Sequence, residues 1–221
     1  MTVALDAGGA NAARPFIEAA KPEHPSLIDD RHVLDERFGV VNVPNALWID
    51  EHGMIVRPAE PASIERSALR DMDIPDGLPE DIRDVFVEAK AIRDDSEEYR
   101  AAIYDWVENG PASAYALSPD EVIARSQPRG HDQAAAAAAF ELGLHCERNG
   151  DHAGAVQWWR EAHRLDTYNW TYKRQAWSIE TTAEGQLSDM AQGPTDAYDG
   201  NWAADVKRLG GGANYYPAFQ R

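Results

Sequence analysis

Cysteine is almost absent from this sequence, which has only Cys146 among its 221 residues. A single thiol excludes an intrachain disulfide, a CxxC redox pair and a zinc ribbon. Segments of the forms GxxxxGK(S/T), GxGxxG, GxSxG and HExxH are missing as well. The sequence therefore offers no support for a phosphate-binding loop, a dinucleotide site, a serine hydrolase or a zinc protease. We expect no cofactor and no metal.

Long apolar runs and basic clusters are also missing. No run approaches the roughly 18 apolar residues that span a bilayer, and the N-terminus lacks the basic and apolar regions of a signal peptide. The 38 acidic residues outnumber 21 basic ones, for a net charge of −17 at pH 7. Such a surface repels phosphate backbones and anionic lipid, and solubility or life in high salt is its simplest explanation. We expect a soluble, cytoplasmic protein that binds neither nucleic acid nor membranes.

Short apolar runs alternate with helix-spaced segments over the first 60 residues, which is typical of an α/β fold. The last two runs flank Gly53, a turn residue, and predict an antiparallel hairpin. The predicted elements are a strand at 2–6, a helix at 11–20, a strand at 26–30, a helix at 33–38, and strands at 46–50 and 54–57.

After Pro61 the strand signals cease and helical spacing takes over. Ser96 and Ser118 are candidate N-caps, and Pro79 and Pro119 suit first turns. The predicted helices cover 79–93, 96–109, 119–126, 133–149, 152–165 and 169–183. The remainder, with its three consecutive glycines, shows little periodicity and predicts an extended tail that packs over a surface.

The run FGVVNVPNALWIDEHGMIV at residues 38–56 combines a glycine, a Val-Pro pair, an apolar strand ending in Ile-Asp, a turn glycine and a closing strand. It resembles the redoxin branch of the thioredoxin-like superfamily. The resemblance implies a cis peptide bond at Val43-Pro44, with Val43, Pro44 and Asn45 in contact with a bound peptide. Asn45 departs from the threonine usual in the family. The alternative is that Pro44 only opens an edge strand.

In the family that this run resembles, a CxxC helix and the strand before it would precede residue 2. That strand lies between those like 2–6 and 46–50, so its absence predicts a gap in a mainly parallel sheet. Each unpaired buried backbone group costs about 1–3 kcal/mol. The two strands could close up directly, the tail or another segment could fill the gap, or a second chain could supply a strand. We favour a second chain, identical or not.

Residues 140–166 have the spacing of a tetratricopeptide (TPR) repeat: Leu142-Gly143, then Ala155, Trp159 and Ala162. This resemblance implies two antiparallel helices that approach at small residues, with Trp159 between them. Thr167 replaces the usual final proline. Residues 169–183 fit a capping helix. A lone repeat cannot bury its own face and must pack on neighbouring helices or on a partner.

The hairpin also carries the candidate chemical groups. We interpret Cys146 as a buried, inert thiol. Glu141, His145 and His163 could suggest a metal site, but their spacing lacks a certain third ligand and favours surface polar residues.

Aromatic residues are dense between 158 and 177, and packing between helices is their simplest explanation. The functional alternative is a helical interaction surface, with these candidates: Trp158, Trp170, Tyr172 and Trp177.

Together these patterns predict an α/β thioredoxin-like partial domain followed by an α-helical, TPR-like domain. The expected ranges are 1–60 for the half-fold, 61–130 for a helical linker region, 131–185 for the hairpin with its capping helix, and 186–221 for the tail. The predicted function is a non-catalytic interaction or scaffold protein with a protein partner or self-association. The alternative is a thiol-disulfide oxidoreductase or peroxidase whose CxxC half is missing or supplied by another chain, and which is inactive alone.

Overall fold

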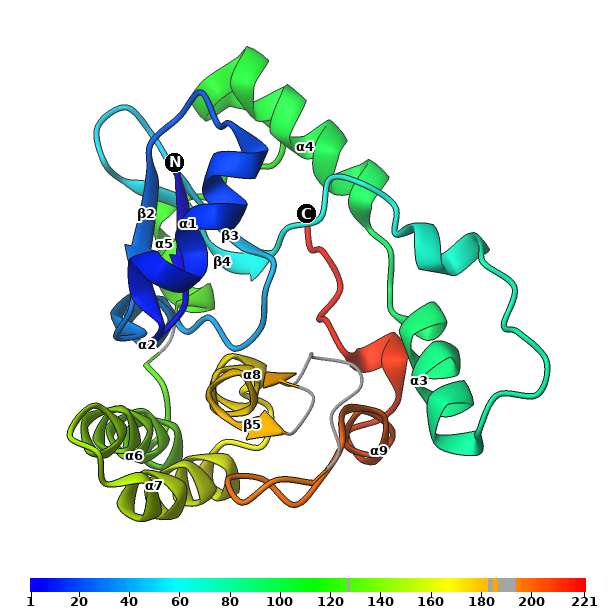
Figure 1. Cartoon of the computed structure of the whole chain (residues 1–221). Coiled ribbons are helices and arrows are strands. Elements are labelled where there is room, and N and C mark those ends of the chain that lie inside the picture. The colour runs from blue at the N-terminus through cyan, green and yellow to red at the C-terminus, as the bar shows by residue number, and fades with distance from the viewer. Residues whose placement is uncertain (127, 183–184, 187–193) are drawn as a thin grey trace. The chain divides into compact units, whose positions relative to one another are not determined.

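The computed structural model describes residues 1–126, 128–182, 185–186 and 194–221 (Figure 1). The fold is mixed α/β and mainly helical, with two-stranded sheets. It divides into two compact units. The first joins residues 1–41 to the described part of 129–189 and to 194–199, and the second joins the described part of 42–128 to 200–221. The units cut across the ranges expected from the sequence, because each is closed by contacts between residues far apart in the chain.

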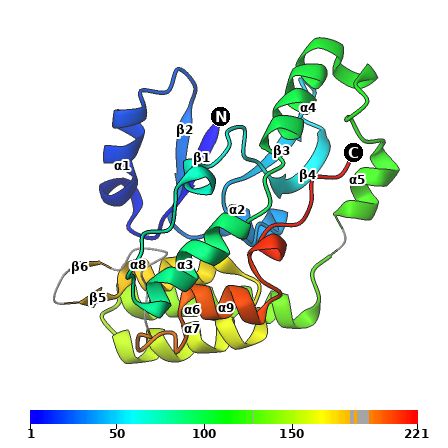
Figure 2. The same cartoon turned by 90° about the vertical axis from the view of Figure 1, so that its right-hand side faces the viewer.

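The first unit begins with a βαβ arrangement, as the sequence predicts. Strand β1 (Thr2–Leu5) pairs in parallel with β2 (Ser26–Asp29), so that Thr2 lies opposite Ser26 and Leu5 opposite Asp29. Helix α1 (Gly9–Ala20) connects them and packs beside β2 (Figure 2). The helix ends at Lys21, whose left-handed backbone donates its N–H to the carbonyl of Ile17.

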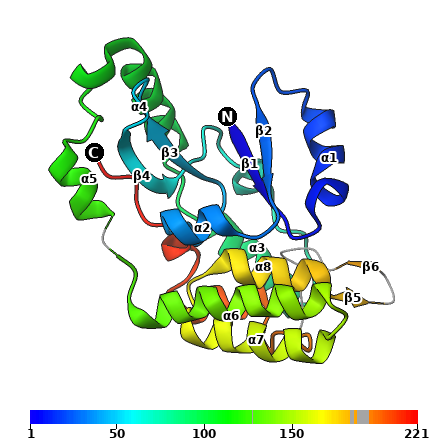
Figure 3. The same cartoon turned by 90° about the vertical axis from the view of Figure 1, so that its left-hand side faces the viewer.

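The rest of the first unit is mainly helical, with one short two-stranded sheet. Figure 3 shows α6 and α7 side by side as a hairpin, with α8 next to them. The core contains small alanines and the rings of Phe140, Trp159 and Tyr172. The elements are α2 (Val33–Phe38), α6 (His131–Arg148), α7 (His152–Leu165), α8 (Trp170–Ile179), β5 (Thr181–Thr182) and β6 (Gly185–Gln186).

Gly143 and Trp159 determine how closely helices α6 and α7 approach each other. Trp159 is fully buried, and so are Ala155 and Ala162 on the same helix. A Cβ atom added at Gly143 would lie 2.4 Å from two ring atoms of Trp159. The small residue therefore leaves the space that the indole ring fills, as the repeat spacing implies.

The second unit begins with the predicted antiparallel hairpin of β3 (Asn45–Ile49) and β4 (Ile55–Pro61). Its turn is fixed by the Asp50 carboxylate, which accepts the N–H groups of His52 and Met54 at 2.9 and 2.8 Å. Helix α4 (Ser96–Asn109) packs on the hairpin, where the Trp48 indole donates to the Tyr99 hydroxyl at 2.8 Å.

Helix starts in the second unit follow the sequence signals in part. Ser118 caps α5 (Pro119–Arg125) in a reciprocal capping box with Glu121. Ser96 does not cap α4; Asp95 holds that position, and the Ser96 hydroxyl donates to Asp94 instead. Helix α3 (Glu80–Ala91) follows Pro79.

The expectation of an extended tail is wrong for the part of the tail that the structure describes. Asn201 caps a helix, α9 (Trp202–Arg208), which packs on α3 (Figure 2). Trp202 and Val206 are buried on its inner face, and the N–H of Gly212 donates to Glu88 at 2.7 Å. These contacts supply the apolar burial that makes a seven-residue helix stable. Residues 187–193 lie outside the described residues.

Arg57 links distant segments of the second unit. Its side chain is fully buried, forms two hydrogen bonds with Glu60 at 2.7 and 2.8 Å, and donates to the carbonyl oxygens of Tyr115 and Gln220. The guanidinium lies 5.3 Å from the Trp48 ring centroid and 4.8 Å from that of Phe219. One residue thus joins the β-hairpin to the C-terminal segment.

No helix in the described ranges is long and apolar enough to cross a membrane.

We expect Gly143→Ala to lower the free energy of unfolding by about 1–3 kcal/mol, because the new methyl group overlaps the Trp159 ring. Glu141→Ala, at an exposed position of the same helix, is the control and should change it by less than about 0.5 kcal/mol. Urea unfolding measures both. A Gly143→Ala variant as stable as the wild type would contradict the close approach, and partial rescue by Trp159→Phe would support it.

We expect Arg57→Met to lower the free energy of unfolding by about 3–5 kcal/mol, because Glu60 and two carbonyl groups lose their donor. Arg57→Lys should restore part of the loss, since it keeps the charge without the planar fork. The control is Arg66→Met, which removes an exposed pair with Asp71 and should have little effect. Equal losses at positions 57 and 66 in chemical unfolding would contradict the role of Arg57.

Candidate functional site

Strand β1 has one edge that no other strand covers in the described residues. The N–H of Thr2 donates to the Pro25 carbonyl at 3.0 Å, and that of Asp6 donates to the Asp29 carbonyl at 3.3 Å. In a parallel pair, alternate residues turn their N–H and C=O groups toward the same neighbour. The peptide groups of Val3 and Leu5 therefore face the opposite edge, and β1 pairs only with β2.

This edge carries none of the usual protection against pairing. The strand reads Thr-Val-Ala-Leu, without a charge or a proline, whereas natural edge strands commonly carry lysine, proline or a bulge. Apolar side chains are exposed nearby in the same βαβ arrangement: Phe16 on α1 is 78% exposed and Leu27 on β2 is 47% exposed. The edge can accept a further strand through backbone hydrogen bonds.

The structure decides part of the question raised by the expected gap in the sheet. Strand β3, in the second unit, pairs with β4, and β1, in the first, pairs with β2. Residues 194–221 contain α9 and a short 3-10 turn, and no strand that could fill the gap. A strand from the tail is therefore not found among residues 194–221.

The predicted peptide-contact segment lies in the second unit. The Val43-Pro44 peptide bond is cis. The Val43 carbonyl accepts the Tyr216 hydroxyl at 2.7 Å, and the Val43 N–H donates to the Asn42 side chain at 2.9 Å. The chain itself therefore occupies both backbone groups of Val43. The binding role of Val43, Pro44 and Asn45 stays a prediction, and sequence reasoning missed Tyr216, which lies 173 residues away.

Most of the candidate aromatic surface lies in the interior. Trp170, Tyr172 and Trp177 are at most 3% exposed, because α8 packs its aromatic face into the first unit. Trp158 alone of the four candidates is substantially exposed, at 40%. The interpretation as helix packing agrees with this burial.

The candidate thiol and metal ligands are also scattered. Cys146 is partly buried beside the core of the first unit. Glu141 and His145 are exposed, but the expectation that His163 is a surface residue is wrong, because its ring packs edge-on against Tyr198 at 4.8 Å. No three metal-ligating side chains gather in the ranges that the structure describes.

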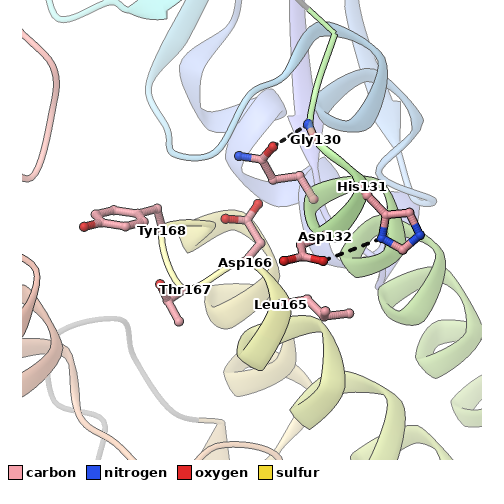
Figure 4. Close-up of a pocket in the computed structure, with 8 residues that line it drawn as sticks. Gly130, His131, Asp132, Leu165, Asp166, Thr167 and Tyr168 are labelled. Atoms are coloured by element: carbon pink, nitrogen blue, oxygen red, sulfur yellow. Dashed lines mark hydrogen bonds and ion pairs between the residues drawn. The ribbon is translucent and has the colours of Figure 1, made fainter.

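A pocket of about 490 Å³ lies where α6 begins and α7 ends (Figure 4). Burial raises the pKa of Asp166, against the opposing hydrogen bonds from Asn169 and the Tyr168 backbone. Gln133 accepts the Gly130 N–H at 2.7 Å as a helix cap. The lining residues are Gly130, His131, Asp132, Gln133, Leu165, Asp166, Thr167 and Tyr168. They complete helix ends, and none of them is an activated nucleophile.

No family model, no curated protein and no solved structure matches this chain. The open edge of β1 is the feature best suited to bind another molecule, because it presents backbone N–H and C=O groups.

Proposed function

We propose that this chain is a non-catalytic protein-interaction or scaffold protein, in which a strand of a second polypeptide adds to the open edge of β1. The observation that carries the proposal is the parallel β1–β2 pair, whose Val3 and Leu5 peptide groups face an edge to which no strand of the described residues is paired. Parallel sheets are normally larger and covered on both faces. In strand addition, backbone hydrogen bonds provide affinity and alternate side chains provide specificity.

The size of the edge indicates what the partner must contribute. Val3 and Leu5 offer two N–H and two C=O groups, and each hydrogen bond contributes about 1 kcal/mol net. Four bonds alone correspond to a dissociation constant of about 1 mM. A stable complex therefore also needs apolar burial, at about 25 cal/mol for each Å² removed from water.

The charge of the chain favours a different polypeptide over a second copy. Two copies would each carry a net charge of −17, and their repulsion opposes self-association. A basic partner gains in encounter rate from the same field. The partner that fits is an extended, basic segment with apolar side chains in alternate positions.

The test uses displayed eight-residue peptides with lysine at both ends, selected for binding to the whole protein. We expect the selected peptides to alternate apolar and polar residues, and Val3→Pro to weaken their binding at least tenfold. Proline at position 3 removes an N–H that faces the open edge, and it leaves the bonds to β2 in place. Trp158→Ala removes the exposed aromatic of the helical hairpin and serves as the matched control.

Two outcomes would overturn the proposal. Binding that is lost in Trp158→Ala and kept in Val3→Pro would move the interaction to the hairpin. Hydrogen exchange at the Val3 and Leu5 amides as slow as at Ala4, in dilute protein alone, would show that the chain itself covers the edge. Ala4→Pro, which removes a bond to β2, shows how a disrupted sheet appears in the same measurements.

The alternative of a thiol oxidoreductase has less support, since Cys146 is the single thiol and Val43 is occupied within the chain. We expect no turnover in a disulfide-reduction assay with the protein alone, and no change on Cys146→Ser. One thiol cannot both attack and resolve a mixed disulfide. Turnover that disappears in Cys146→Ser would refute the non-catalytic assignment.

A further inference from the structure

His32 is a buried histidine at the junction between the βαβ arrangement and the helices of the first unit. It precedes α2 in a left-handed backbone conformation and is 4% exposed. Its Nδ1 atom lies 2.8 Å from Asp35 Oδ2, and its Nε2 atom lies 3.0 Å from Gln175 Oε1 on α8. Its ring forms a T-shaped pair with Phe140 on α6, with centroids 5.1 Å apart.

Hydrogen bonds fix the orientation of the Gln175 amide. The Ala7 N–H, just after β1, donates to Oε1 at 2.8 Å. At the other end, Nε2 of Gln175 donates to the Ser178 hydroxyl at 2.7 Å, while that hydroxyl donates to the Gln175 carbonyl at 2.9 Å. A turned amide would place N–H groups against each other at Ala7. Oxygen therefore faces His32, and only a protonated Nε2 can bond to it.

The other ring nitrogen needs a proton as well. Asp35 accepts the Glu36 N–H through Oδ1 at 2.8 Å and faces His32 Nδ1 through Oδ2. Both ring nitrogens of His32 therefore face oxygen acceptors, a carboxylate and an amide carbonyl, and this arrangement favours the doubly protonated imidazolium.

The charges around His32 are mostly negative. Asp35 and Glu36 lie on α2 and Asp29 on β2, while Arg129, before α6, pairs with Glu36 at 3.7 Å. Burial alone lowers the pKa of His32, but the hydrogen bond and charge of Asp35, the Gln175 bond and the charge of Asp29 together raise it above its ordinary value. Tyr172 on α8 stays neutral, because burial raises its pKa.

We propose that protonation of His32 is a pH switch that couples the end of β1 to helices α6 and α8. Loss of the Nε2 proton leaves a lone pair against Gln175 Oε1, so two acceptors face each other. Gln175 cannot relieve this by turning its amide over, because its nitrogen would then face the Ala7 N–H. The Gln175 side chain must therefore move away as a whole, and Ala7 loses its acceptor. This inference does not depend on the proposed strand binding.

The direction of the pH effect follows from the raised pKa. Protonation stabilises the fold fully below the unfolded-state pKa of about 6.5, and the stabilisation is lost as the pH rises through the folded-state value. The first unit should therefore be tighter in mildly acidic solution than in mildly alkaline solution.

The test follows the His32 ring nitrogens and the Ala7 amide by NMR from pH 5 to 9 in the whole protein. We expect both ring nitrogens to carry protons at low pH. We also expect Ala7 exchange to accelerate, beyond the intrinsic rise with pH, at the same midpoint as His32 titration. In His32→Gln this transition should disappear, and in His152→Gln, which alters an exposed histidine paired with Glu147, it should remain.

Gln175→Glu distinguishes the switch from a merely structural histidine. A carboxylate at this position still accepts from Ala7 and attracts the imidazolium more strongly, so the midpoint should move to higher pH. A single protonated ring nitrogen in the wild type at pH 5 would overturn the proposal. So would Ala7 protection in the wild type that shows no transition at the His32 midpoint.

Discussion

The hydrogen bond from the Ala7 backbone to the side chain of Gln175 joins residues 168 positions apart, and the first compact unit depends on it. Parallel strands require a crossover helix, and their ends must then be held by another part of the chain. Gln175 does this through an amide whose three contacts, to Ala7, His32 and Ser178, are mutually consistent. The N-terminal strands consequently belong with helices that come more than 100 residues later.

Arg57 has the corresponding place in the second unit, where it reaches Gln220 across 163 positions. Both residues are buried polar groups, which are costly unless every donor and acceptor has a partner. That requirement selects one arrangement among many compact ones, because a displaced segment would leave a buried group unpaired. Each unit therefore gathers segments from both halves of the sequence.

The same requirement draws attention to β1. Val43 has both of its backbone groups occupied within the chain. The peptide groups of Val3 and Leu5 face an edge to which no described strand is paired. Association with another polypeptide is the function that this contrast supports. His32 follows β2 of the same βαβ arrangement and contacts Gln175, which also holds Ala7 after β1.

The sequence by itself determined the elements whose signals are local. Apolar spacing, caps and turn glycines located the strands and helices from β1 to α8, and the spacing of Gly143 and Trp159 indicated the closely packed hairpin. Asn201 could have indicated α9, but three glycines after the helix made the tail look irregular. For the site, the sequence located the strand 2–6 and the proline, but not Tyr216 as the group that occupies Val43.

Only the tertiary structure decided which segments pack together and which side chains are buried. Trp158 and Trp170 belong to one aromatic-rich stretch, yet one is 40% exposed and the other 3%. The division of the chain after Val41 and the contact of His32 with Gln175 both depend on pairings across more than 100 residues. Local periodicity carries no information about such pairings, because they are set by which arrangement satisfies buried polar groups and fills space at once.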